Sequence, residues 1–132
     1  MRRATRSDEG MISAFVVTLT VALLFAAGLA YDAGRLVDAR IAAADAAAAA
    51  SRAGAQQTVV DAAGHVTLDD HAAEQAAGRF VSDPAYRVGV NASGGAVTVT
   101  VRRTVALTFL RLFGLTHKDV RATHTAEPVE GS

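Results

Sequence analysis

The 132-residue sequence contains no cysteine, no tryptophan and only two prolines, and its charges cancel. Without cysteine the chain has no disulfide, no thiol nucleophile and no thiolate ligand for a metal ion. Thirteen basic and thirteen acidic side chains leave no net field that would attract a polyanion. We therefore expect no nucleic-acid partner and no disulfide framework, and a chain of this length allows one small domain at most.

Charge is also absent from one long stretch, residues 11–31, which read MISAFVVTLTVALLFAAGLAY. A helix of this stretch is roughly 31 Å long, which matches a hydrocarbon core of about 30 Å. A core helix of a small soluble domain would be shorter and would carry polar residues at helical period. The few hydroxyls, such as Thr18 and Thr20, can bond the carbonyl one turn back. The sequence therefore predicts a transmembrane helix over residues 11–31.

A cleavable secretion signal is the main alternative, because basic residues precede the stretch and the small residues GLA precede Tyr31. The apolar run exceeds the usual length of about 7–15 residues, and helix-forming sequence continues without a breaker to Gly54. A permanent anchor is the favoured interpretation. Positively charged flanks stay in the cytoplasm, so residues 1–10 are predicted to be a cytoplasmic basic leader and the chain after residue 31 to be extracytoplasmic. Arg35 and Arg40 act against this orientation.

Residues 32–55 are predicted to extend the same helix outside the membrane, because alanine has the highest helix propensity. Arg35 is expected to pair with Asp32 and with Asp38 on the helix surface, and Gly54 is a plausible stop. Large apolar side chains are scarce here. The extension is therefore expected either to lie close against another helix or to form a stalk without a partner.

Small residues recur at every fourth position of the membrane helix and its exit, which predicts a packing ridge. The predicted ridge consists of Ala14, Thr18, Ala22, Ala26, Ala30 and Gly34. Such a ridge lets two membrane helices approach closely. The alternative is that this register only reflects an abundance of small residues. Gly28, about 200° round the helix from Ala26, is predicted to face lipid and to accept a larger side chain.

Residues 56–126 are predicted to form a small α+β module. Two β-prone pieces, Thr58–Val60 and His65–Leu68, indicate a hairpin or an irregular loop. Asp69 or Asp70 is expected to cap a helix that ends before Pro84. Residues 86–101 alternate apolar and polar side chains around Ser-Gly-Gly, which is typical of a half-buried hairpin.

The remaining segments complete the predicted fold class. LTFLRLFGL is expected to be a short helix ending at Gly114, and KDVRATHTAEPV a last strand, followed by a disordered tail over residues 127–132. The fold class is therefore α+β. A long N-terminal transmembrane helix, extended by an Ala-rich helix, precedes a module of one helix and three or more antiparallel strands.

No pattern of catalytic or metal-binding residues is evident. His65, Asp69, Asp70 and His71 crowd one segment, but their spacing matches no known ligand motif and the two aspartates are explained as helix caps. No Gly-rich loop opens a helix after a strand, and neither Ser82 nor Ser93 lies in a nucleophile motif. We expect no enzymatic activity, no metal and no cofactor.

Several segments resemble the TadE/TadG-like proteins of tight-adherence (Flp) pilus systems. The basic head, Gly10 before the span, GLAYDAGR at its exit and the Ala-rich helix ending in RAGA carry the likeness at the N-terminal side. GHVTLDDHAAEQAAGRF, AVTVTVRRTV, LTFLRLFGL and VRATHTAEP resemble the actinobacterial members. The resemblance implies a minor pseudopilin or pilus-assembly protein with candidate prepilin cleavage between Gly10 and Met11.

One position departs from the pilin pattern. Type IV pilin-like proteins carry Glu five residues after the cleavage Gly, where this chain has Phe15. That departure favours an uncut accessory protein retained in the membrane by the whole span. Its expected partners are the membrane and other pilus or secretion-system proteins, bound through the N-terminal helix as a homo- or hetero-oligomer. The alternative function is a membrane-tethered extracytoplasmic domain that binds a ligand or the cell wall and is unrelated to pili.

Overall fold

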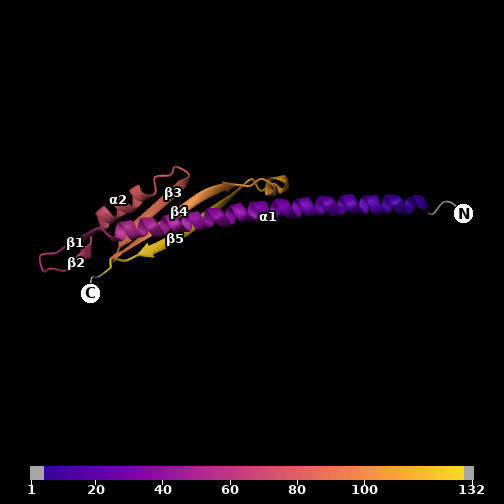
Figure 1. Ribbon diagram of the computed structural model, residues 1–132. Coiled ribbons are helices and arrows are strands. Elements are labelled where there is room, and N and C mark those ends of the chain that lie inside the picture. Colours follow the sequence, from indigo (N-terminus) through magenta and orange to yellow (C-terminus); the bar gives the residue numbers. More distant parts are fainter. Residues whose placement is uncertain (1–4, 130–132) are drawn as a thin grey trace.

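The computed structural model describes the fold of residues 5–129 and is dominated by one long helix, α1, Thr5–Ala55. The N-terminal half of α1 projects away from the rest of the protein, and all other elements pack along its C-terminal half (Figure 1). The predicted continuity of the transmembrane segment and its Ala-rich extension is confirmed. No proline or paired glycine interrupts the helix between these two parts, so nothing in the sequence ends it before Gly54.

A three-stranded antiparallel sheet forms the body of the module, with strand order β3-β4-β5. Its strands are β3, Tyr86–Ser93; β4, Ala96–Ala106; and β5, His117–Ala126. Gly94 and Gly95 join β3 to β4 with φ angles of 64° and 81°. Positive φ at both central residues matches the right-handed twist of a hairpin, so the glycines make the predicted hairpin possible.

The two helices cover one face of this sheet. α1 packs on β4 and β5, and α2, Asp70–Phe80, packs on β3 and on α1. The valines of β4 that face the helices, Val97, Val99 and Val101, are fully buried. Opposite them lie alanines of α1, including Ala43, Ala47 and Ala50. Small side chains let the helix approach the sheet closely, so residues 32–55 form part of the core and the stalk alternative is wrong.

The shorter elements follow local sequence signals. A hairpin of β1, Thr58–Val60, and β2, Val66–Leu68, connects α1 to α2. Asp69 caps α2 by accepting a hydrogen bond from the Ala72 N–H at 3.0 Å. Of the two aspartates proposed as the cap, Asp69 therefore takes the role, because its backbone is still extended.

The connection between β4 and β5 holds a single 3₁₀ turn, η1, Leu110–Phe113, where a short helix was predicted. Gly114 ends it with a left-handed φ of 86° and donates its N–H to the Arg111 carbonyl. Of the tail predicted to be disordered, residues 127–129 form neither helix nor strand, and residues 130–132 lie outside the described part of the chain.

The close contact between α1 and the sheet predicts a position-dependent response to the same substitution. Ala47→Leu places a large side chain where no space exists, and overpacking of this kind costs about 1–3 kcal/mol. Ala44→Leu adds the same group on the exposed side and should change stability by less than about 0.5 kcal/mol. Amide hydrogen exchange of β4 in detergent micelles measures both. Equal protection in the two variants would contradict the packing described here.

Candidate functional site

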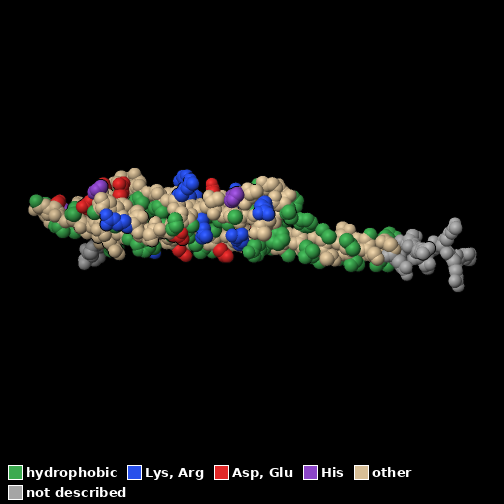
Figure 2. All heavy atoms as spheres, turned by 90° about the horizontal axis from the view of Figure 1, so that it is seen from above, with side chains coloured by type: hydrophobic (Ala, Val, Ile, Leu, Met, Phe, Trp, Pro, Cys, Tyr) green, Lys and Arg blue, Asp and Glu red, His purple; other side chains and the backbone are tan. Residues whose placement is uncertain are grey.

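The projecting part of α1 is an apolar helix that no other element of the described chain covers. Every residue from Gly10 to Ala27 is exposed. Among the described residues, one helix is long and apolar enough to cross a membrane; its most apolar window has a mean hydropathy of 2.4 and is only 6% buried. A helix that is apolar on all sides needs a protein core or a membrane around it. In Figure 2 the described part of this projecting helix shows no charged side chains, whereas Lys, Arg, Asp and Glu side chains are spread over the module.

The six residues of the predicted ridge are all exposed, so the chain's own elements leave them free. Thr18 donates its hydroxyl to the Ala14 carbonyl at 2.8 Å, which satisfies that polar group within the helix. Each four-residue step turns the helix by about 40°, so the six positions wind through about 200°. One straight partner helix could contact only part of the ridge at a time. Gly10 and Met11 lie within the continuous helix.

Gly28, in contrast, does not face lipid, and the prediction that it would is wrong. A Cβ atom built on Gly28 would overlap the ring of Phe109. The Phe109 ring also packs edge-on against Tyr31, with 6.1 Å between ring centroids. One turn earlier Phe25 meets Phe113 at 6.0 Å. The β4–β5 loop therefore lies directly on the outer end of the predicted span (Figure 1).

Asp32 fastens this loop to α1 and is fully buried. One carboxylate oxygen accepts from the Thr108 N–H at 2.9 Å; the other accepts from the N–H groups of Phe109 and Leu110 at 2.7 and 2.8 Å. These donors lead into η1, where the first N–H groups have no partner within the turn. Burial raises the pKa of Asp32, but the three N–H donors and the charge of Arg35 outweigh it and hold that pKa below its ordinary value.

The surface ion pairs predicted around Arg35 do not form. Among the side chains that the structure describes, the only ion pair is Asp61 with His65. Arg35 instead donates to the Thr108 hydroxyl at 3.4 Å, so it supports the same loop as Asp32. Spacing on one helix could not reveal this role, because the loop lies more than 70 residues further along the chain.

A second long-range tie joins β5 to α1. Ser51 is fully buried, and its hydroxyl lies 2.9 Å from Nδ1 of His124. A serine next to a histidine can form a nucleophile and its base. Ser51, however, has no surface that a substrate could reach, and its hydroxyl also bonds the Ala48 carbonyl at 3.0 Å. The pair therefore holds the end of the sheet against the helix.

The outer face of the sheet presents a row of arginines. Arg87, Arg102 and Arg121 are cross-strand neighbours on β3, β4 and β5. All three are exposed, and none forms an ion pair with a carboxylate of the described chain. Like charges directly opposite each other destabilise a sheet. This row is a surface suited to anionic groups on a partner.

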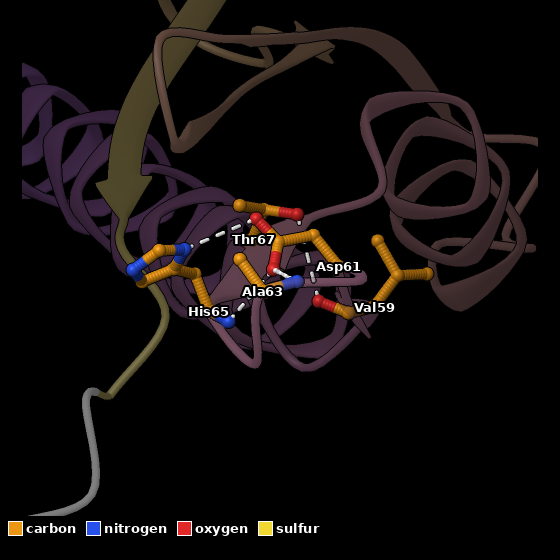
Figure 3. A network of polar contacts seen from close by, with 5 residues as sticks. All are labelled: Val59, Asp61, Ala63, His65 and Thr67. Atoms are coloured by element: carbon orange, nitrogen blue, oxygen red, sulfur yellow. Dashed lines mark hydrogen bonds and ion pairs between the residues drawn. The ribbon is translucent and has the colours of Figure 1, made fainter.

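Of the residues considered for metal binding, His65 takes part in the turn between β1 and β2 (Figure 3). Asp61 accepts hydrogen bonds from the N–H groups of Ala63 and His65 at 2.8 and 2.9 Å, and its other oxygen meets the His65 ring at 3.2 Å. The hydrogen bonds from His65, first of all the one from its backbone, lower the pKa of Asp61. His71 bonds Gln75 on α2. In residues 10–129 no three His, Asp or Glu side chains converge.

The role of Asp32 predicts a local, pH-dependent effect. Asp32→Asn keeps the size of the side chain but replaces an accepting oxygen by an amide donor, so at least one loop N–H loses its partner. The amides of Thr108, Phe109 and Leu110 should exchange faster, whereas Asp38→Asn, on the exposed side of the same helix, should leave them unchanged. Hydrogen exchange measures both.

The pH dependence follows from the lowered pKa of Asp32. A carboxyl whose pKa falls on folding stabilises the fold above its unfolded pKa of about 3.9. That stabilisation is lost as the pH falls through the lower folded value. Protection of the three amides should therefore persist down to the ordinary carboxyl range and disappear below it. Protection that is independent of pH across this range would contradict the assigned role.

Comparisons with known proteins place the chain in a family. The model of the Tad-like Flp pilus-assembly family matches residues 25–126, from the C-terminal part of the predicted span through the last strand. No curated protein and no solved structure matched the chain. The matched region holds Gly28, Asp32 and the loop that they contact. Because the match covers well over half of the sequence, the chain belongs to the Tad-like Flp pilus-assembly family, whose members are assembly proteins rather than enzymes.

Proposed function

We propose that the chain is a single-pass, membrane-anchored accessory protein of a Flp pilus or a related secretion apparatus, similar to a minor pseudopilin of the actinobacterial TadE/TadG type. One observation carries this proposal: an uncovered apolar helix continues without a break into the core of a folded module. Such a helix holds the module at the membrane, and the family points to pilus assembly as the process served.

The module is proposed to lie on the extracytoplasmic side. Arg2, Arg3 and Arg6 precede the span, and short basic flanks stay in the cytoplasm. The sheet carries arginines and threonines on its outer face, including cross-strand threonine pairs at 2.8 and 3.0 Å. This face is polar enough to remain in water while the helix is held in lipid.

Partners are proposed to bind through the small-residue ridge of the helix. Lipid removes the hydrophobic drive for helices to associate, so close packing of small side chains has to supply the contact energy. The chain's own elements cover Gly28 and leave Ala26 and Ala30 exposed. The ridge is therefore open to another helix, in a homo- or hetero-oligomer, while the module stays attached.

The span is proposed to stay on the mature protein without cleavage after Gly10. A pilin-like Glu would offset the amine of a cleaved neighbour, and Phe15 offers no such charge. A free amine in lipid without a partner is costly. The protein then acts in the membrane as an assembly factor rather than as a subunit of the pilus shaft.

A membrane-tethered binding domain unrelated to pili is the second candidate, and the arginine row favours it. Three arginines without carboxylate partners would suit an anionic ligand or wall polymer. The two functions differ in what the helix does. In the binding domain it only tethers, so its ridge should tolerate larger side chains.

Orientation is tested with single cysteines, which is straightforward in a chain without any. Cysteine at Ser93, in the turn of the β3–β4 hairpin, should react with a membrane-impermeant thiol reagent on intact cells. Cysteine at Arg6 should react only after the cells are opened. The reverse pattern would place the module in the cytoplasm and overturn the proposal.

The ridge is tested by a pair of matched substitutions. Ala26→Leu should separate packed helices and remove close van der Waals contacts, so both crosslinking to pilus components and the number of surface pili should fall. Ala27→Leu adds the same side chain to an exposed position about 100° round the helix and should have little effect.

Two outcomes would contradict the assembly role. If Ala26→Leu and Ala27→Leu retain the same crosslinks, the ridge makes no contact and is an accident of composition. If deletion of the whole chain leaves pilus number unchanged at matched growth, the tethered binding domain becomes the better interpretation. Electron microscopy counts the pili, and immunoblotting confirms equal expression of the variants.

A further inference from the structure

The β4–β5 loop carries a cluster of exposed apolar side chains at its tip. Leu112, Phe113 and Leu115 are 72%, 64% and 55% exposed, and all three lie within four residues. Large apolar side chains gathered at one tip mark a contact surface, whereas scattered ones are ordinary. Asp32 and Gly28 hold this tip in place without burying it, so its exposure is a fixed feature of the fold.

The position of the tip along α1 indicates what it contacts. Phe113 packs on Phe25, which lies six residues, or about 9 Å, inside the outer end of the predicted span at Tyr31. The tip therefore lies beside the membrane helix at a depth that belongs to lipid. The hairpin of β1 and β2 lies far from this loop, at the C-terminal end of α1 (Figure 1).

The backbone of the loop is suited to a surrounding of low polarity. Leu112 and Gly114 donate their N–H groups to the carbonyls of Phe109 and Arg111, each at 3.1 Å, and Leu115 donates to Leu110 at 3.1 Å. At the base, Leu107 donates to Thr116 at 2.9 Å. Unpaired backbone groups are costly in lipid, and this turn pairs these donors internally.

We propose that the β4–β5 loop is a second membrane contact, which inserts its apolar tip into the outer leaflet beside the transmembrane helix. The inference rests on the proposed membrane anchor. Lipid is the occupant because the tip is continuous with the predicted span through Phe25 and because residues 11–31 of the helix carry no charge. Arg111, also exposed, has a stem long enough to reach the phosphate level of the headgroups.

This second contact fixes the orientation of the module relative to the membrane. A single helix leaves a module free to rotate and tilt about the axis of the span. A tip beside the helix sets which side of the module faces the bilayer. Because the sheet packs on the same continuous helix, the ridge residues Ala26 and Ala30 then point in a defined direction relative to the bilayer, and the arginine row on the outer sheet face stays in water.

The experiment uses the absence of tryptophan in the natural chain. Single tryptophans replace Leu112 at the tip, Leu24 in the exposed span, and Val59 in β1 at the far end of the module. Each full-length variant is reconstituted in phosphatidylcholine vesicles with and without lipids brominated in the acyl chain, which quench tryptophan in the hydrocarbon region. The Leu112→Trp signal should lose at least half as large a fraction as the Leu24→Trp signal, and Val59→Trp should lose almost none.

The three positions separate the possible failures. Quenching at Leu24→Trp without quenching at Leu112→Trp would keep the anchor and overturn the loop insertion. No quenching at Leu24→Trp would overturn the anchor itself. Leu115→Trp serves as a second probe of the tip, and retained exchange protection of the Phe109 amide shows that the loop is intact in each variant. Insertion requires quenching at both tip positions.

Discussion

The sheet packs closely against a face of α1 that consists mainly of small residues, and the rest of the structure depends on this packing. That face runs from Gly54 through alanines such as Ala47 and Ala43 toward Asp32 and Gly28. At Gly54 a Cβ would already lie 2.9 Å from the Val97 side chain and 3.0 Å from the Ala73 carbonyl. Because the residues from Ala43 to Gly54 on this face are small, the buried valines of β4 reach the helix directly. The helix that carries the candidate membrane span is thus the same element that supports the core.

This arrangement divides the surface of α1 between two tasks. The module occupies the face that carries Gly28 and Asp32, and Ala26 lies about 200° away from Gly28. Contacts within the chain and proposed contacts with partner helices therefore do not compete. The hydrogen bonds of Asp32 hold the β4–β5 loop on α1 at the C-terminal end of the predicted span. A buried carboxylate there is tolerated because three N–H donors surround it.

The distribution of charge follows the same division. The described part of the predicted span carries no charged side chain, and Asp32 is buried at its end. The arginines of the row lie on the face of the sheet that points away from α1. Three cross-strand arginines oppose the stability of the sheet that they lie on. Among the described residues, none of the three forms an ion pair with a carboxylate.

Local patterns in the sequence by itself determined the helix, the hairpin and the strand pairing directions. The long apolar stretch, the alanine run and the alternation around Gly94 and Gly95 each act within a few residues, so their meaning can be read without a fold. The tertiary structure decided the rest. Gly28 packs against an aromatic ring, Asp32 accepts three N–H hydrogen bonds, and Ser51 forms a hydrogen bond with His124. All of these partners lie more than 70 positions further along the chain. No periodicity encodes such pairs, because they arise only when the sheet folds back onto the helix.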